Sequence, residues 1–326
     1  MISKNQLPGI FFTLIISVLV FVSTYFFSFL NSILVGLLLG IFIGNIYKIN
    51  PILFPGIGLM GAKTLEFSIL FLAFGINYTN MGKLGWKSFV LIALVVFSMI
   101  ILTVYLAKKI KCPGTVGWMV GFGTAICGSS AIAALAPSIS NKNKEDIGVS
   151  MAVVNLYGTV GMIFFPFILA AFSFTSIQSS LILGGTLHSV GNVVGAGFTM
   201  SSEIGEQALA IKLARISLLS PGLIFFNYIT QRNTIKNWKQ HFQLPWYLWG
   251  FMAITILVSV VDFPKNILDG TSEIGKILLT LAMIAIGLRV SFTALLQSGK
   301  RGLIFGLLLF ILQTAIILFG IFILEI

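Results

Sequence analysis

The sequence predicts an all-α membrane protein that crosses the bilayer with ten to eleven helices. Of its 326 residues, 57% are hydrophobic and only 9% are charged, whereas a soluble domain carries roughly a quarter charged residues. The mean hydropathy is +1.05. Apolar runs of about 18 to 22 residues recur along the chain, and at a rise of about 1.5 Å per residue each can cross a hydrocarbon core about 30 Å thick.

Eleven apolar runs, each bounded by polar or basic residues, define the expected helices in chain order. The first six cover residues 8–27, 30–47, 64–78, 88–107, 114–138 and 148–172. The last five cover residues 180–200, 207–228, 245–262, 276–292 and 302–324. The first run follows Lys4 and has no small-residue cleavage site behind it, so we expect an uncleaved span.

Basic residues predict the orientation, because cytoplasmic loops collect Lys and Arg. With the N-terminus inside, the cytoplasmic side holds Lys4, Lys48, Lys63, Lys108, Lys109, Lys111, Arg232, Lys236, Lys239, Arg289, Lys300 and Arg301. The other side holds Lys83, Lys87, Lys142, Lys144, Lys265 and Lys276. We therefore expect a bacterial cytoplasmic (inner) membrane protein with its N-terminus inside and its C-terminus outside. The same bias accounts for the net charge of +11, so no nucleic-acid partner is expected.

Two pairs of segments indicate internal repeats, with halves near residues 1–140 and 146–326. LFLAFGINYTNMGKLGWKSFVL (70–91) resembles MIAIGLRVSFTALLQSGKRGLIFGL (283–307), and the two cross in opposite directions, as inverted repeats require. GTAICGSSAIAA (123–134) and GTLHSVGNVVGA (185–196) are both rich in Gly and small polar residues. This second pair crosses in the same direction unless residues 112–137 re-enter the membrane, and both readings stay open.

The segment GFGTAICGSSAIAALAP (121–137) predicts a broken helix. Glycine weakens a helix by about 1 kcal/mol relative to Ala, and freed backbone groups are tolerated in a bilayer only inside protein or beside a cavity. A half-helix starting near Gly128 would present its N–H groups, with the Ser129 and Ser130 hydroxyls, to an anion. Thr124 and Cys127 lie in the same segment. The alternative is close helix packing through small residues.

Three further groups add polar chemistry inside predicted spans. His188 and Asn192 are four residues apart and would share a helical face, where the histidine can carry a proton or hydrogen-bond a neighbouring helix. Lys212 and Arg215 fall inside the eighth span, where a basic residue costs about 2.5 to 3.5 kcal/mol. A bound anion, or Glu203 and Glu206, would offset that cost, unless both cations snorkel to the interface. Arg289 is either a further anion ligand or a helix end.

Other patterns carry less functional information. GIGLMG (56–61) fits a dinucleotide-binding pattern but is expected in a loop without the strand and helix that give it meaning. Gly36, Gly40 and Gly44 form a smooth face for packing or for a homodimer. Apart from Glu66, no carboxylate is expected at mid-membrane, which disfavours a cation antiporter built on paired Asp residues. Cys112 and Cys127 form no disulfide framework, and no metal site is expected.

The motifs GTAICGSSAIAALAP, GGTLHSVGNVVGAG, KLARISLLSP and LAMIAIGLRVSF, taken in this order, resemble the YeiH-type family of membrane proteins to which sulfate export is ascribed. The resemblance covers most of the chain. It implies an inner-membrane exporter of ten or eleven helices, similar in plan to the bile-acid symporter and sodium–proton antiporter superfamily. Many family members have Glu where this chain has Ser189, which puts a histidine–carboxylate proton relay in doubt.

We therefore expect residues 1–326 to form one transporter domain for a small oxyanion or organosulfonate. The predicted site contains Thr124, Cys127, Gly128, Ser129, Ser130, His188, Asn192, Lys212, Arg215 and Arg289. The expected partners are the anion and membrane lipid, with no cofactor beyond a coupling H+ or Na+. Two alternatives remain: a sodium- or proton-coupled symporter of a small organic anion, and an intramembrane enzyme with Cys127 as nucleophile and His188 as base.

Overall fold

The computed structural model confirms the all-α class. It describes residues 3, 5–26, 31–47, 49–75, 84–110, 112, 114–139, 144–230, 245–290 and 300–326. Every regular element within these ranges is helical. The chain divides into two compact units, Met1–Asn80 with Trp246–Thr293, and Met81–Pro245 with Ala294–Ile326. Each unit is made of two segments that are far apart in the sequence, and each is described here by itself.

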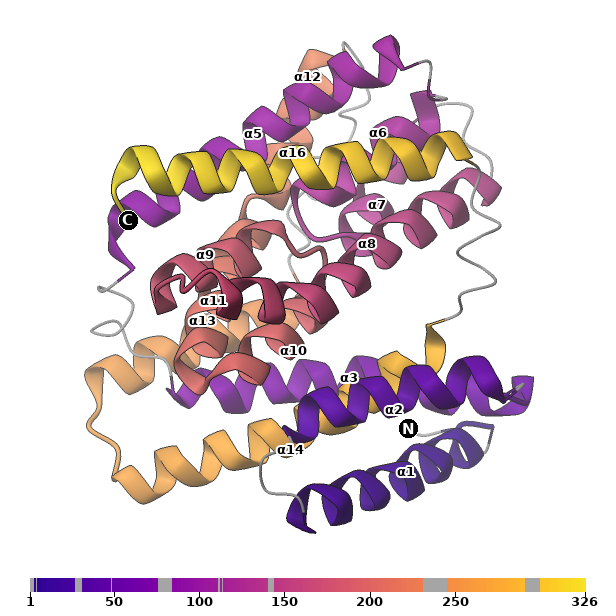
Figure 1. Ribbon diagram of the computed structural model, residues 1–326, viewed down its shortest axis with the longest axis vertical. Coiled ribbons are helices and arrows are strands. Elements are labelled where there is room, and N and C mark those ends of the chain that lie inside the picture. The colour runs from indigo at the N-terminus through magenta and orange to yellow at the C-terminus, as the bar shows by residue number, and fades with distance from the viewer. Residues whose placement is uncertain are drawn as a thin grey trace. The chain divides into compact units, whose positions relative to one another are not determined.

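The first unit contains α1 (Leu7–Phe26), α2 (Ser32–Ile46), α3 (Phe54–Leu72), α13 (Trp246–Val260) and α14 (Lys265–Arg289), with short 3-10 turns at Pro51–Leu53 and Ala73–Gly75. Helix α14 packs along both α2 and α3 (Figure 1). The glycine stripe of α2 makes this approach close. A Cβ on Gly40 would lie 2.6 Å from the Ile284 carbonyl oxygen, and one on Gly44 would lie 2.7 Å from that of Leu288. The stripe therefore packs against α14 within the chain.

The second unit contains α5 (Gly85–Lys109), α6 (Gly114–Ala125), α7 (Ser129–Leu135), a 3-10 turn (Ala136–Ser138), α8 (Lys144–Ala171) and α9 (Ser176–Thr186). It continues with α10 (Val190–Met200), α11 (Ser202–Ser217), α12 (Leu219–Ile229) and α16 (Lys300–Leu324). Helices α9, α10 and α11 pack together (Figure 1). Helix α7 turns back on α6, because Ile132 Cγ1 lies 3.0 Å from the position of a Cβ on Gly123.

Each of the eleven predicted runs coincides with a helix or a pair of helices, but only some helices are long enough to span. Six described helical stretches have the length and hydropathy to cross a membrane, or seven if the α11–α12 pair, bent by 43°, is one span. Helix α3 begins at Phe54 rather than near residue 64, so the expectation that GIGLMG lies in a loop was wrong. The middle parts of the predicted repeat, residues 76–83 and 291–299, lie outside the described residues.

Candidate functional site

Two helix breaks face each other in the second unit. Helix α6 ends at Ala125 and α7 begins at Ser129, with Gly128 at φ 70° between them, a conformation that favours glycine. Helix α9 ends at Thr186 and α10 begins at Val190. The position of a Cβ on Gly128 lies 3.4 Å from His188 Cβ, which places the two breaks in contact. Both Gly-rich segments of the predicted second pair therefore contain a break.

Lys212 of α11 ties the two breaks together. Its side chain is 0% exposed, so it does not snorkel to an interface. The ammonium donates to the Ile126 carbonyl oxygen (2.8 Å) and to the Leu187 carbonyl oxygen (2.7 Å), one from each break. An ammonium has three N–H groups, so one N–H remains beyond these two bonds.

Arg215, one turn further along α11, is also 0% exposed and bonds to the same two breaks. Its Nε donates to the Ala125 carbonyl oxygen (2.8 Å), and its Nη2 donates to that of Thr124. Its Nη1 donates to the Leu187 carbonyl oxygen (3.1 Å). The guanidinium thus fills carbonyl acceptors at the C-terminal ends of α6 and α9, which have no partner inside their own helices.

Gln313 of α16 supplies a further cap that the sequence analysis did not single out. It is buried, and its Nε2 donates to the Gly185 carbonyl oxygen (2.8 Å) in the last turn of α9. Its signal in the sequence was a lone amide inside an otherwise apolar run. Asn155 was also missed. Its Oδ1 accepts a hydrogen bond from the Ser129 hydroxyl (3.0 Å) at the start of α7.

The positive charge at the breaks has no buried carboxylate beside it. All nine Asp and Glu residues of the chain lie within the described ranges, and none is buried. Glu203, predicted as an internal partner, is exposed and accepts from Gln207 Nε2 (3.2 Å), while Glu206 is half-buried. The groups that Lys212 and Arg215 contact are therefore backbone carbonyls, which sequence alone did not reveal.

His188 lies in the second break, not on a helix. The expected shared helical face with Asn192 was therefore wrong, because α10 begins at Val190 with Ser189 as its cap. Both side chains still lie beside the same residue, since His188 Cβ and Asn192 Nδ2 are both close to Gly158 of α8. His188 is 1% exposed. Its Nε2 lies 3.2 Å from Thr124 Oγ1, and its ring centroid lies 5.5 Å from that of Phe310.

The other predicted site residues fall in different surroundings. Cys127 is buried in the first break, Ser129 is half-buried, and Ser130 is exposed. Arg289 is exposed at the C-terminal end of α14 in the first unit, near Gly58 of α3. The structure thus brings together nine of the ten predicted residues in one unit. Among the described residues, no three His, Cys, Asp or Glu side chains form a metal site.

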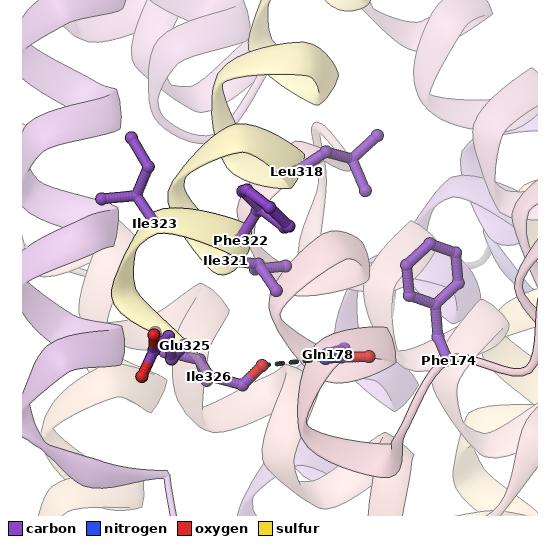
Figure 2. A pocket seen from close by; sticks show the side chains of 8 residues that line it. All are labelled: Phe174, Gln178, Leu318, Ile321, Phe322, Ile323, Glu325 and Ile326. Carbon is purple, nitrogen blue, oxygen red and sulfur yellow. Dashed lines mark hydrogen bonds between the residues drawn. The ribbon is translucent and has the colours of Figure 1, made fainter.

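A cavity of about 700 Å³ opens elsewhere in the second unit, at the end of α16. Figure 2 shows Phe174, Leu318 and Phe322 around it, with Gln178 donating to the Ile326 carbonyl oxygen (2.8 Å). Gln178 lies in the first turn of α9, whereas the break follows the end of α9, about 15 Å away along the helix. The described residues that line the cavity include Glu325 but no Lys, Arg or His, so this lining does not favour an anion.

These features define a class: a helical membrane protein whose second unit holds two facing discontinuous helices tied together by buried cations. The family described as conserved hypothetical protein 698 matches residues 8–306. The UPF0324 membrane protein YdhF of Lactococcus lactis subsp. lactis is 31% identical over 321 residues, covering 96% of this chain and 97% of that protein. The UPF0324 membrane protein TauZ of Paracoccus pantotrophus is 30% identical over 254 residues, covering 75% and 74%.

The chain therefore belongs to the UPF0324 family of membrane proteins, which confirms the YeiH-type resemblance. A solved sodium proton antiporter from Methanocaldococcus jannaschii aligns over 94% of this chain and 100% of that one, with 15% identity and a TM-score of 0.30. A similarity at that level does not establish a shared fold. The superfamily relationship stays a prediction.

Proposed function

We propose that this protein is a secondary transporter that exports a small oxyanion or organosulfonate across the bacterial cytoplasmic membrane, with its N-terminus inside. The observation that carries the proposal is the pair of fully buried cations, Lys212 and Arg215, at two facing helix breaks without a buried carboxylate. In a membrane protein such charges mark substrate pathways and need a compensating partner.

The carbonyl contacts compensate only part of this charge. Each helix C-terminus is equivalent to about half a negative charge, so the ends of α6 and α9 together offset about one of the two positive charges. The N-terminal end of α10 adds a further partial positive charge. A surplus of about 1.5 positive charges suits an anion that binds during transport and leaves afterwards.

The polar groups at the breaks would hold such an anion. The remaining N–H of Lys212 is the candidate for direct contact, with Ser130 and Asn192 as neutral donors. The Ser129 hydroxyl would join them only by giving up its bond to Asn155 Oδ1. Thr124 and His188 would position the anion, while Cys127 and Gly128 shape the turn beside it. Arg289 is a separate candidate in the first unit, and Arg289→Met in the stability assay described next tests its role.

Thermal stability of the detergent-purified protein tests the proposal, because a ligand that binds only the folded state raises stability by mass action. The panel is sulfate, sulfite, thiosulfate, small sulfonates, carboxylates and sodium. We expect one sulfur oxyanion or sulfonate to stabilise the protein, and Lys212→Met to abolish the effect. Lys265→Met, at an exposed lysine of α14, is the matched control. Stabilisation by sodium or carboxylates alone would instead favour the symporter.

Flux into proteoliposomes separates transport from chemistry on the same ligand. We expect labelled anion to move without being altered and Cys127→Ser to retain that flux. Turnover of the anion that is lost in Cys127→Ser, with binding retained, would favour the enzyme alternative.

A further inference from the structure

The hydroxyl of Thr124 fixes which nitrogen of His188 carries a proton. A threonine hydroxyl has one hydrogen to donate, and Thr124 Oγ1 donates it to the Val120 carbonyl oxygen (2.8 Å) one turn earlier in α6. The contact between Thr124 Oγ1 and His188 Nε2 (3.2 Å) then needs its hydrogen from the imidazole. The hydrogen-bond network therefore assigns the Nε2–H form to His188.

In that form, Nδ1 of His188 is an acceptor with a free lone pair. The atom is buried and has no hydrogen-bond partner among the described residues. Lys212 and Arg215 are the nearby cations, and their bonds go to backbone carbonyls. An unpaired buried acceptor destabilises the folded protein, so His188 Nδ1 can still accept one hydrogen bond at the breaks.

We propose that the transported anion brings the donor of this hydrogen bond itself, so that the substrate is an anion with its own O–H or N–H group. This inference rests on the proposed function and narrows its substrate class. An acid oxyanion or a hydroxyl- or amino-substituted sulfonate supplies that donor, whereas fully deprotonated sulfate has only acceptors. The anionic end would face Lys212 and the starts of α7 and α10, while the donor end would bond to His188 Nδ1.

The surroundings of His188 support a contact between its Nδ1 and the donor end of the anion. His188 Cβ lies 3.4 Å from the Cβ position of Gly128 and 3.2 Å from that of Gly158, so the base of this side chain lies between the first break and α8. Asn192 lies against the same glycine of α8. The ring tilts against Phe310 at 37°, an apolar neighbour that offers Nδ1 no strong donor.

The test compares two monovalent sulfonates of similar size, 2-hydroxyethanesulfonate and 1-propanesulfonate, which differ by a hydroxyl in place of a methyl group. Their apparent affinities for the full-length protein are measured by ligand-dependent thermal stabilisation. We expect the hydroxyl-bearing anion to bind at least tenfold more tightly, because a site with a buried acceptor rejects the analogue that leaves it unpaired. This comparison needs no variant.

His188→Gln and His188→Asn form a matched pair. The Gln amide takes the place of Nε2 and removes the acceptor at Nδ1, so we expect its preference between the two sulfonates to vanish. The Asn amide oxygen reaches the position of Nδ1, so this variant keeps a preference of severalfold.

Equal affinity of the wild type for the two sulfonates would overturn the inference and leave the proposed function standing, as would a preference unchanged in His188→Gln. If no anion of the whole panel stabilises the protein, the inference and the proposed function both fail. If a water molecule and not the substrate donates to His188 Nδ1, the wild type should bind the two sulfonates equally well.

Discussion

Arg215→Met should destabilise the second unit by about 2 to 6 kcal/mol. The substitution removes the donors to the carbonyl oxygens of Thr124 and Ala125 and a longer bond of 3.5 Å to that of Gly184, while Lys212 still donates to that of Leu187. Two buried carbonyls therefore lose a close side-chain partner, at about 1 to 3 kcal/mol each. Methionine fills similar space but offers no donor. A buried ion pair can often be replaced by two apolar residues without loss of stability, because both charged groups are removed together. Here the acceptors are backbone carbonyls, which remain when the arginine side chain is replaced.

The loss is measured as the shift in the unfolding midpoint of the detergent-purified protein, by denaturant or by heat, in the absence of anions. Arg215→Lys should lose less, because one ammonium can reach one carbonyl but cannot span both as the planar guanidinium does. Arg301→Met, at an exposed position at the start of α16, is the control and should stay within about 0.5 kcal/mol. A loss below about 1 kcal/mol in Arg215→Met would show that these carbonyls do not depend on the guanidinium.

Three other predictions follow from single contacts. Gly40→Ala should cost about 1 to 3 kcal/mol of stability, because its Cβ would lie 2.6 Å from the Ile284 carbonyl oxygen, whereas Gly270→Ala, with nothing within 4 Å, should stabilise α14 slightly. Burial raises the pKa of the Cys112 thiol, and the nearby Arg301 lowers it by less. At pH 8, Cys112 in a Cys127→Ser background should therefore be alkylated more slowly than free cysteine, and more slowly still when Arg301→Gln is added. An alkylation rate equal to that of free cysteine would contradict this prediction. Thr124→Val removes the hydroxyl that accepts from His188 Nε2–H, so His188 can also carry its proton on Nδ1, and the preference for the hydroxyl-bearing sulfonate should weaken severalfold. Thr124→Ser keeps the hydroxyl and should keep the preference.

Hydropathy located the helices well but missed where some of them begin. Helix α3 starts at Phe54 because Pro55 at its first turn favours helix initiation, although prolines and glycines in that stretch resembled a loop. Helix α14 starts at Lys265, earlier than predicted. Its first turns carry Asp269 and Glu273 and are too polar to register as a membrane run, yet polar residues form helices readily.

Composition predicted the break at Gly128, because clustered Gly and Ser weaken a helix and cap a new one. The hydrogen-bond partners of Lys212 and Arg215 could not be predicted from the sequence, for a physical reason. A break exposes backbone carbonyls that are present in every residue, so no side-chain pattern marks them. The sequence therefore suggested acidic partners such as Glu203 for the two cations, whereas in the structure Lys212 and Arg215 donate to backbone carbonyl oxygens.

The two buried cations are not equivalent, and the difference bears on transport. Arg215 uses its fork on two successive carbonyls of α6 and on Leu187 of the second break, which suits a rigid bond between discontinuous helices. Lys212 spans the same breaks with two of its three N–H groups. The Lys212 ammonium has one N–H beyond its two carbonyl bonds, so it could bind an anion while keeping at least one of those bonds. The Arg215 guanidinium could bind an anion only by giving up its hydrogen bonds to the carbonyls of the breaks. Under the proposed function, Arg215 would hold the two breaks together, and Lys212 would be the charge that the transported anion engages.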